Sequence, residues 1–183
     1  MDRVAVFGGS FDPPHVSHLL CAAYVLATQP IDRVLVIPTF AHPFGKKMAA
    51  YPHRIAMCEA AFADLKRVEI STLEREIGGE SKTLYTLNAL RERHPAWSLR
   101  LVVGSDILHE KHKWFAWDEV VALAPLIVVG RVGFEHPNAG PPVIPAAASR
   151  DVRAALAANE DVSDLVPSAV VDYIGAHALY RNV

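Results

Sequence analysis

Cysteine is scarce in this sequence, and that scarcity excludes two kinds of site. The 183 residues include only two cysteines, Cys21 and Cys58. Two cysteines cannot build a framework of several disulfides, and no zinc-ligand spacing is present. Both residues lie within apolar patterns of helical spacing, so we expect them to be buried free thiols.

The sequence also lacks an excess of charge and a long apolar run. Its formal net charge is −2 at pH 7 with histidine neutral, whereas a nucleic-acid binder usually carries a basic excess. No apolar run is long enough to span a bilayer, and the first four residues lead straight into a predicted strand rather than a signal peptide. We therefore expect a cytoplasmic protein that binds neither nucleic acid nor membrane. A homo-oligomer is left open.

Apolar, β-branched runs alternate with helical patterns along the whole chain. A composition of 51% hydrophobic and 21% charged residues suits a globular protein, and the length predicts a single domain over residues 1–183. Strands apolar on both faces that alternate with helices are typical of a covered parallel sheet. The predicted fold is α/β, a Rossmann-like parallel sheet of about five to six strands with helices on both faces. The predicted strands are 4–7, 33–38, 68–70, 99–104 and 126–129, and the predicted helices are 16–28, 52–65, 81–93, 117–124, 149–158 and 167–178.

The segments that follow the strands are the places to search for a ligand site. In open parallel sheets, ligands bind beyond the carboxyl ends of the strands. Here those segments are 8–18, 39–47, 70–86, 104–114 and 131–153.

The segment Gly8–His18 carries the strongest functional signal. Gly8 and Gly9 let the backbone approach a ligand closely, and the free N–H groups and positive dipole end of the next helix favour an anion. His15 and His18 are three residues apart and share one face at the start of that helix. Imidazole N–H groups in this place are suited to stabilise charge on a reacting phosphoryl oxygen. From the residues alone, a plain connection with two surface histidines, or half of a metal site, fits equally well.

Two common nucleotide-binding loops are missing. A dinucleotide fingerprint needs G-x-G-x-x-G and an acidic residue near the end of the second strand, but that strand ends Val36-Ile37-Pro38-Thr39. A Walker A loop needs G-K followed by Ser or Thr, and that motif is absent.

The segment Gly8–Leu19 resembles the opening motif of bacterial nicotinate-nucleotide adenylyltransferases, which belong to a nucleotidyltransferase superfamily marked by H-x-G-H. Further similarities follow in the family's order over nearly the whole chain. Ser81–Leu87 is similar to S-Y-T-x-x-T-L, Gly104–Asp106 with the later Trp114 is similar to G-x-D and its downstream tryptophan, and Val166–Tyr180 resembles the C-terminal helix.

Three departures from the family pattern bear mainly on the identity of the mononucleotide. Ser17 stands in place of the glycine between the two histidines, and Lys82 stands in place of a tyrosine. The late motif I-S-S-T-x-I-R survives only as Ala148-Ser149-Arg150-Asp151-Val152-Arg153.

The resemblance implies adenylyl transfer from ATP to nicotinate mononucleotide, giving deamido-NAD and pyrophosphate. It implies that His15 and His18 are the catalytic residues and bind phosphate through the transition state. Mg²⁺ would neutralise the leaving pyrophosphate, and because no carboxylate cluster offers a cage, we expect ATP and water to hold the ion, with no metal ligand from the protein. The implied ATP-binding residues are Gly8, Gly9, Ser10, Phe11, Gly104, Asp106, Ser149 and Arg153.

Several of these residues have simpler interpretations that stay open. Asp106 would accept hydrogen bonds from the ribose diol, but it is equally suited to cap a helix. Arg150 is an alternative to Arg153 as the arginine that binds phosphate bidentately.

The acceptor mononucleotide is expected to bind beside ATP, through a different set of residues. Trp114 lies in a polar stretch, and an offset stack on a pyridine ring would explain it, although a half-buried packing role is the alternative. The expected mononucleotide-binding residues are Lys46, Lys47, Tyr85, Thr86 and Trp114, where the two lysines would otherwise be a solvated basic pair.

Two other functions remain open. The first is adenylyl transfer to another acceptor, such as nicotinamide mononucleotide or phosphopantetheine. The second is a nucleotide-binding sensor without catalysis, which fits the altered late motif but not the intact pair of histidines.

Overall fold

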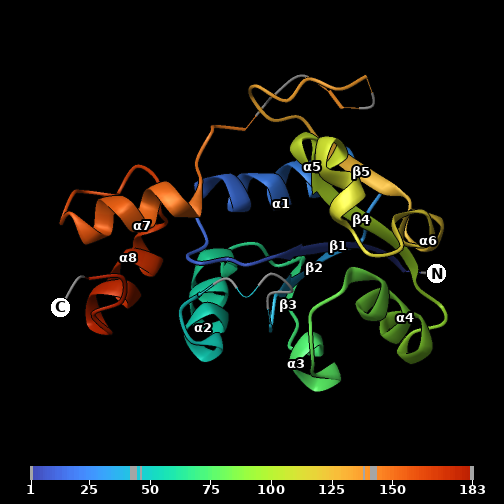
Figure 1. Ribbon diagram of the computed structural model, residues 1–183, viewed down its shortest axis with the longest axis horizontal. Coiled ribbons are helices and arrows are strands. Elements are labelled where there is room, and N and C mark those ends of the chain that lie inside the picture. The colour runs from blue at the N-terminus through green and yellow to red at the C-terminus, as the bar shows by residue number, and fades with distance from the viewer. Residues whose placement is uncertain (1, 42–44, 46, 138, 141–143, 182–183) are drawn as a thin grey trace.

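The computed structural model describes residues 2–41, 45, 47–137, 139–140 and 144–181. These residues form one parallel sheet with the strand order β3-β2-β1-β4-β5 (Figure 1). The strands are β1 Arg3–Gly9, β2 Arg33–Pro38, β3 Val68–Ile70, β4 Ser98–Gly104 and β5 Leu126–Val129. The predicted parallel α/β sheet is confirmed, with five strands.

Helices connect successive strands and cover both faces of the sheet, with α1 and α4 on opposite sides of the strands (Figure 1). The helices are α1 Val16–Thr28, α2 Tyr51–Phe62, α3 Leu73–Ile77, α4 Thr83–Arg93, α5 Ser105–Glu110, α6 Trp117–Leu123, α7 Ser149–Ala157 and α8 Ser168–Ala176, with a 3₁₀ turn at Lys111–Lys113. In the described ranges, every helix is too short or too polar to cross a bilayer.

Side chains along each strand point alternately to the two faces of the sheet, so the core consists of two apolar clusters. In β1, Ala5 packs in one cluster while Val4 and Val6 pack in the other, because successive side chains of a strand point to opposite faces. The first cluster joins the sheet to α1, α2, α7 and α8, and the second joins it to α3, α4 and α6. Cys21 and Cys58 are buried free thiols in the first cluster, as predicted.

Two sequence predictions about helices were wrong. The helix predicted over 81–93 begins at Thr83, with Lys82 rather than Ser81 before its first turn. The Ser81 hydroxyl instead accepts hydrogen bonds from the backbone N–H groups of Phe40 and Ala41, at 3.1 and 3.2 Å. The helix predicted over 52–65 ends at Phe62, where Leu65 N–H turns back to the Phe62 carbonyl.

The difference in burial between two leucines predicts that their substitution by alanine will affect stability differently. Leu87 on α4 is fully buried, whereas Leu20 on α1 is 42% exposed. We expect Leu87→Ala to lower the free energy of unfolding by about 2–5 kcal/mol and Leu20→Ala to change it by no more than about 0.5 kcal/mol, measured by urea denaturation. Equal losses in the two variants would contradict this assignment of the core.

Candidate active site

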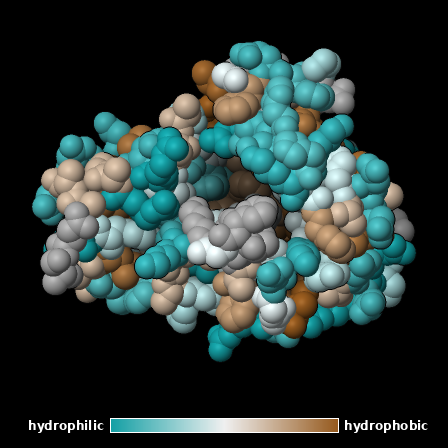
Figure 2. All heavy atoms as spheres, in the orientation of Figure 1, coloured by the Kyte–Doolittle hydropathy of each residue, from teal (hydrophilic) through white to brown (hydrophobic). Residues whose placement is uncertain are grey.

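A cavity of about 850 Å³ opens at the carboxyl ends of the central strands, where the surface is visibly hollowed (Figure 2). Five of the predicted site residues line it. They are Gly8, Gly9, Ser10, Thr86 and Trp114, and the other lining residues include Thr39, Glu74, Lys82, Lys113 and Phe115. The prediction that strand ends form the site therefore agrees with the position of the cavity.

Residues 8–14, which begin at the end of β1, are called the phosphate loop after their predicted role. The loop is held by hydrogen bonds to its carbonyl oxygens. The Gly9 carbonyl accepts from Thr39 N–H at 2.8 Å, and the Ser10 carbonyl accepts from Arg54 Nη1 at 2.8 Å. Arg54 is 1% exposed, so its guanidinium is a buried part of the loop's support. Carbonyl oxygens repel an anion, and engaging them in these bonds leaves the loop better suited to bind phosphate with its N–H groups.

Ser149 and Arg153 support the same loop from α7. Ser149 Oγ donates to the Pro13 carbonyl at 2.9 Å, and Arg153 Nη1 donates to the Asp12 carbonyl at 2.6 Å. The structure thus brings both predicted ATP-binding residues to the loop, but they do not line the large cavity. Arg150 is exposed and pairs with its neighbour Asp151.

The two histidines stack at the start of α1. Their ring centroids are 3.7 Å apart, with 30° between the ring planes. The N–H of His15 donates to Nδ1 of His18 at 3.2 Å, so that nitrogen carries no proton and the neutral ring of His18 has its proton on Nε2. His15 Nδ1 is buried and has no hydrogen-bond partner among the described residues.

Phe11 forms the apolar support beneath this pair. It is 1% exposed, and its ring centroid lies 4.9 Å from that of His18. Its ring also packs edge-on against Phe7 and Phe62. The side chain of Phe11 therefore belongs to the core, and only its backbone remains as a predicted ATP contact.

Burial keeps both imidazoles neutral. It is the main cause that lowers the pKa of His15 to about 4, and the charge of Arg131 adds to it. Burial, His15 and Arg131, in that order, also lower the pKa of His18 well below its ordinary value. Near pH 7 both rings are therefore neutral, and each carries one N–H group that it can donate.

An ion pair marks the end of β4. Arg131 Nη1 donates to Asp106 Oδ2 at 2.8 Å, while Asp106 Oδ1 is buried without a partner in the described part of the chain. A Cβ at Gly104 would lie 2.3 Å from Asp106 Oδ1 and 2.8 Å from Arg131 Cδ, so this pair requires glycine there. Asp106 lies in the first turn of α5, and the N-cap position is Gly104.

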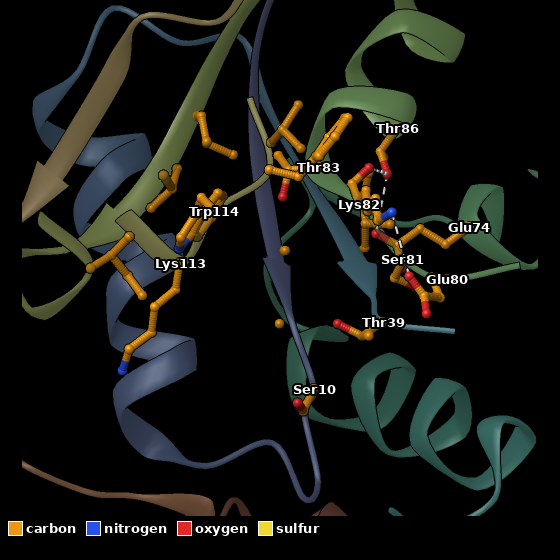
Figure 3. Close-up of a pocket in the computed structure, with 18 of the residues that line it drawn as sticks. Ser10, Thr39, Glu74, Glu80, Ser81, Lys82, Thr83, Thr86, Lys113 and Trp114 are labelled. Carbon is orange, nitrogen blue, oxygen red and sulfur yellow. Dashed lines mark hydrogen bonds and ion pairs between the residues drawn. The ribbon is translucent and has the colours of Figure 1, made fainter. Parts of the chain in front are cut away.

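Two separate segments form facing walls of the cavity. Figure 3 shows Trp114 on one side and Lys82 and Thr86 on the other. The Thr86 hydroxyl donates to Glu74 at 3.2 Å. The ring of Trp114 packs edge-on against that of Trp117, with centroids 5.4 Å apart. An aromatic face and a hydroxyl network thus meet across a space that suits a planar ring.

Two of the expected mononucleotide contacts do not line the large cavity, and a third is not among the described residues. Tyr85 is 44% exposed, stacks toward Phe115 and does not line the cavity. Lys47 lines a separate cavity of about 260 Å³ together with Asp12 and Arg153. Lys46 falls outside the described residues.

Two charged residues near the site were missed or undervalued by sequence reasoning. Arg131 is not among the predicted site residues, although it lies two residues after the fifth strand, where ligand contacts are expected. Arg54 lies in α2, and no motif in the sequence indicates that its buried guanidinium donates to backbone carbonyls. Within the described ranges, no three His, Cys, Asp or Glu side chains are grouped to hold a metal ion.

The lowered pKa of His15 makes stability depend on pH. Its ordinary pKa is 6.5, and in the folded protein the value is about 4. Between these values the unfolded chain binds more protons, so the free energy of unfolding falls as the pH drops from about 6.5 to about 4. We expect urea denaturation to show this fall and His15→Gln to reduce it. A variant that loses as much stability as the parent over this range would refute the assignment to His15.

Comparison with known proteins agrees with this geometry. The family model described as cytidylyltransferase-like matches residues 6–163. A relative from Anaeromyxobacter dehalogenans, named "Probable nicotinate-nucleotide adenylyltransferase", is 46% identical, covering 98% of this chain and 97% of its own length. One of the same name from Myxococcus xanthus is 40% identical, covering 97% and 94%.

The fold is also shared with a solved structure. The Plasmodium falciparum nicotinic acid mononucleotide adenylyltransferase complexed with NaAD superposes with a TM-score of 0.85 at 20% identity, covering 98% of each chain. The family match and the two bacterial relatives, which span nearly the full length, show that the chain belongs to the cytidylyltransferase-like family and, within it, to the nicotinate-nucleotide adenylyltransferases.

Proposed function

We propose that the chain transfers the adenylyl group of ATP to nicotinate mononucleotide, releasing pyrophosphate and forming deamido-NAD. The observation that carries this proposal is the stacked pair His15 and His18 at the start of α1. The pair follows the backbone of Gly8, Gly9 and Ser10, which lines the large cavity, although neither histidine lines it. The names of the bacterial relatives, and the bound NaAD named for the Plasmodium neighbour, support the same reaction and acceptor.

The chemistry needs positioning and charge stabilisation more than covalent help. An oxygen of the acceptor phosphate attacks the α-phosphorus of ATP, and the bond from that phosphorus to the β-phosphate bridging oxygen breaks. In the proposal, the Nε2–H of His18 and the ring of His15 donate to the phosphoryl oxygens as negative charge grows on them. The rings are already neutral and desolvated, so little reorganisation is needed in the transition state.

The remaining ATP contacts follow from position. Gly8, Gly9 and Ser10 line the cavity and would bind phosphate through the backbone. Asp106 has a buried free oxygen that can accept a ribose hydroxyl. On the acceptor side, Trp114 would stack on the pyridine ring and Thr86 would bind near it.

Magnesium is expected to arrive with ATP. The Asp12 carboxylate is already engaged by Tyr180 and Ala49, and among the described residues no three His, Cys, Asp or Glu side chains are grouped to hold a metal ion. Phosphate oxygens and water would therefore hold Mg²⁺, which supplies charge neutralisation for the leaving pyrophosphate. The single domain, the cytoplasmic location and any homo-oligomer remain predictions.

A panel of acceptors tests the proposed reaction. Pyrophosphate release from ATP is measured with nicotinate mononucleotide, nicotinamide mononucleotide and phosphopantetheine, each at equal concentration. We expect the highest kcat/KM with nicotinate mononucleotide. A higher value with another acceptor would reassign the substrate, and no release with any of them would favour a nucleotide-binding sensor.

The catalytic role of His18 predicts a specific loss. His18→Ala should lower kcat roughly 10²–10³-fold, because a donor to the developing charge is removed, with little change in the melting temperature. His94→Ala is the matched control, since His94 is exposed and stacks on Trp97 at 3.8 Å, away from the cavity. Near-normal turnover in the His18 variant would refute the role.

Lys82 is expected to influence acceptor choice. Its Nζ lies 3.4 Å from Glu80 and 4.9 Å from the Phe115 ring centroid, on the wall opposite Trp114. A cation there favours a pyridine carboxylate over an amide, so Lys82→Tyr should lower the kcat/KM ratio of nicotinate to nicotinamide mononucleotide by roughly 10-fold. Exposed Lys66→Met is the control. An unaltered ratio in the Tyr variant means that Lys82 does not determine specificity.

A further inference from the structure

Asp12 lies at the bend of the phosphate loop and is fully buried. Burial of a carboxylate is costly unless partners compensate it. Its Oδ1 accepts from the hydroxyl of Tyr180 at 2.8 Å and from the N–H of Ala49 at 3.1 Å. Its Oδ2 lies 3.6 Å from Arg153 Nη1, the atom that also binds its carbonyl. The carboxylate thus joins segments that are far apart in the sequence.

Both backbone groups of Ala49 are hydrogen-bonded to side chains. Its N–H donates to Asp12, and its carbonyl accepts from Arg54 Nε at 3.0 Å. Another nitrogen of the same guanidinium donates to the Ser10 carbonyl. The stretch that carries Lys47 is therefore tied to the phosphate loop by two independent contacts, through Asp12 and through Arg54.

Tyr180 reaches this carboxylate from beyond α8, in an unusual backbone conformation. Its φ is +63°, in the left-handed region that bulky residues rarely adopt. Such a conformation is unfavourable for a bulky residue and persists where the surroundings fix it. Burial, followed by the charge of Asp12, raises the pKa of the Tyr180 hydroxyl, so it remains a protonated donor.

We infer that Asp12 and Tyr180 are positioning residues, which set the phosphate loop relative to the Lys47 segment from behind the site. Neither side chain lines the large cavity; both line the small cavity behind the loop with Lys47 and Arg153. This inference depends on the proposed function in one respect, because it assumes that the loop binds ATP. The C-terminal segment therefore takes part in catalysis without contacting substrate.

The test compares two tyrosines of the C-terminal segment. Tyr180→Phe removes only the hydroxyl on Asp12. Tyr173→Phe removes the hydroxyl that lies 3.0 Å from His53 Nδ1 between α8 and α2, and it is the matched control. We expect Tyr180→Phe to lower kcat/KM for ATP roughly 10-fold, as for loss of a hydrogen bond to a charged group, and Tyr173→Phe to leave it unchanged. Both should lower the melting temperature by similar amounts.

A second measurement needs no substrate. Hydrogen–deuterium exchange over residues 8–12 should quicken in Tyr180→Phe and stay at the parent rate in Tyr173→Phe. Asp12→Asn, which keeps the shape but removes the charge, should show the same faster exchange and a larger loss of kcat/KM. Because exchange is measured on the free protein, its outcome is separate from the identity of the acceptor.

Two results would overturn the inference. One is parent-like exchange and parent-like kcat/KM for ATP in Tyr180→Phe. The other is an equal loss of kcat/KM in the two tyrosine variants, which would show only general destabilisation. If instead exchange quickens as expected while the parent releases no pyrophosphate with any acceptor, the positioning contact stands and the proposed reaction fails.

Discussion

The candidate site depends on one constraint: the carbonyl oxygens of the backbone that leaves β1 are held in hydrogen bonds within the protein, and this leaves the loop suited to an anion. Thr39, Arg54, Arg153 and Ser149 supply donors to four of those oxygens, at Gly9, Ser10, Asp12 and Pro13. The donors come from β2, α2 and α7, so the local geometry of a short loop is determined by distant parts of the chain. A glycine pair alone permits this conformation, but the surrounding hydrogen bonds select it.

Burial determines the protonation state of the two histidines. Phe11 packs beneath His18, and the rings of His15 and His18 exclude water from each other. Their lowered pKa values follow mainly from that desolvation. A neutral imidazole requires no counterion in the resting site, and its N–H group is suited to a phosphoryl oxygen whose negative charge grows during the chemical step.

Much of the fold follows from the sequence. The bounds of β2, β3 and β5 were predicted as observed, because strands covered on both faces are apolar at almost every position. The helices α3 and α5 were missed because five or six residues are too few to show a helical period. The cavity wall at Thr86 and Trp114 was predicted from the resemblance, and its position agrees with the structure. Arg131, and the part that Arg54 and Asp12 play, could not be found, because their partners lie far away in sequence and only tertiary packing brings them together.

The sheet also separates two sets of supporting contacts. Arg54, Arg153 and Tyr180 support the phosphate loop from elements that pack in the first apolar cluster, whereas Thr86 and Lys82 belong to α4 and the turn before it, which pack in the second. Substitutions at sites that share no partners usually act additively. If the proposed roles hold, acceptor preference can therefore change by substitutions around α4 that leave the support of the loop after β1 unaltered.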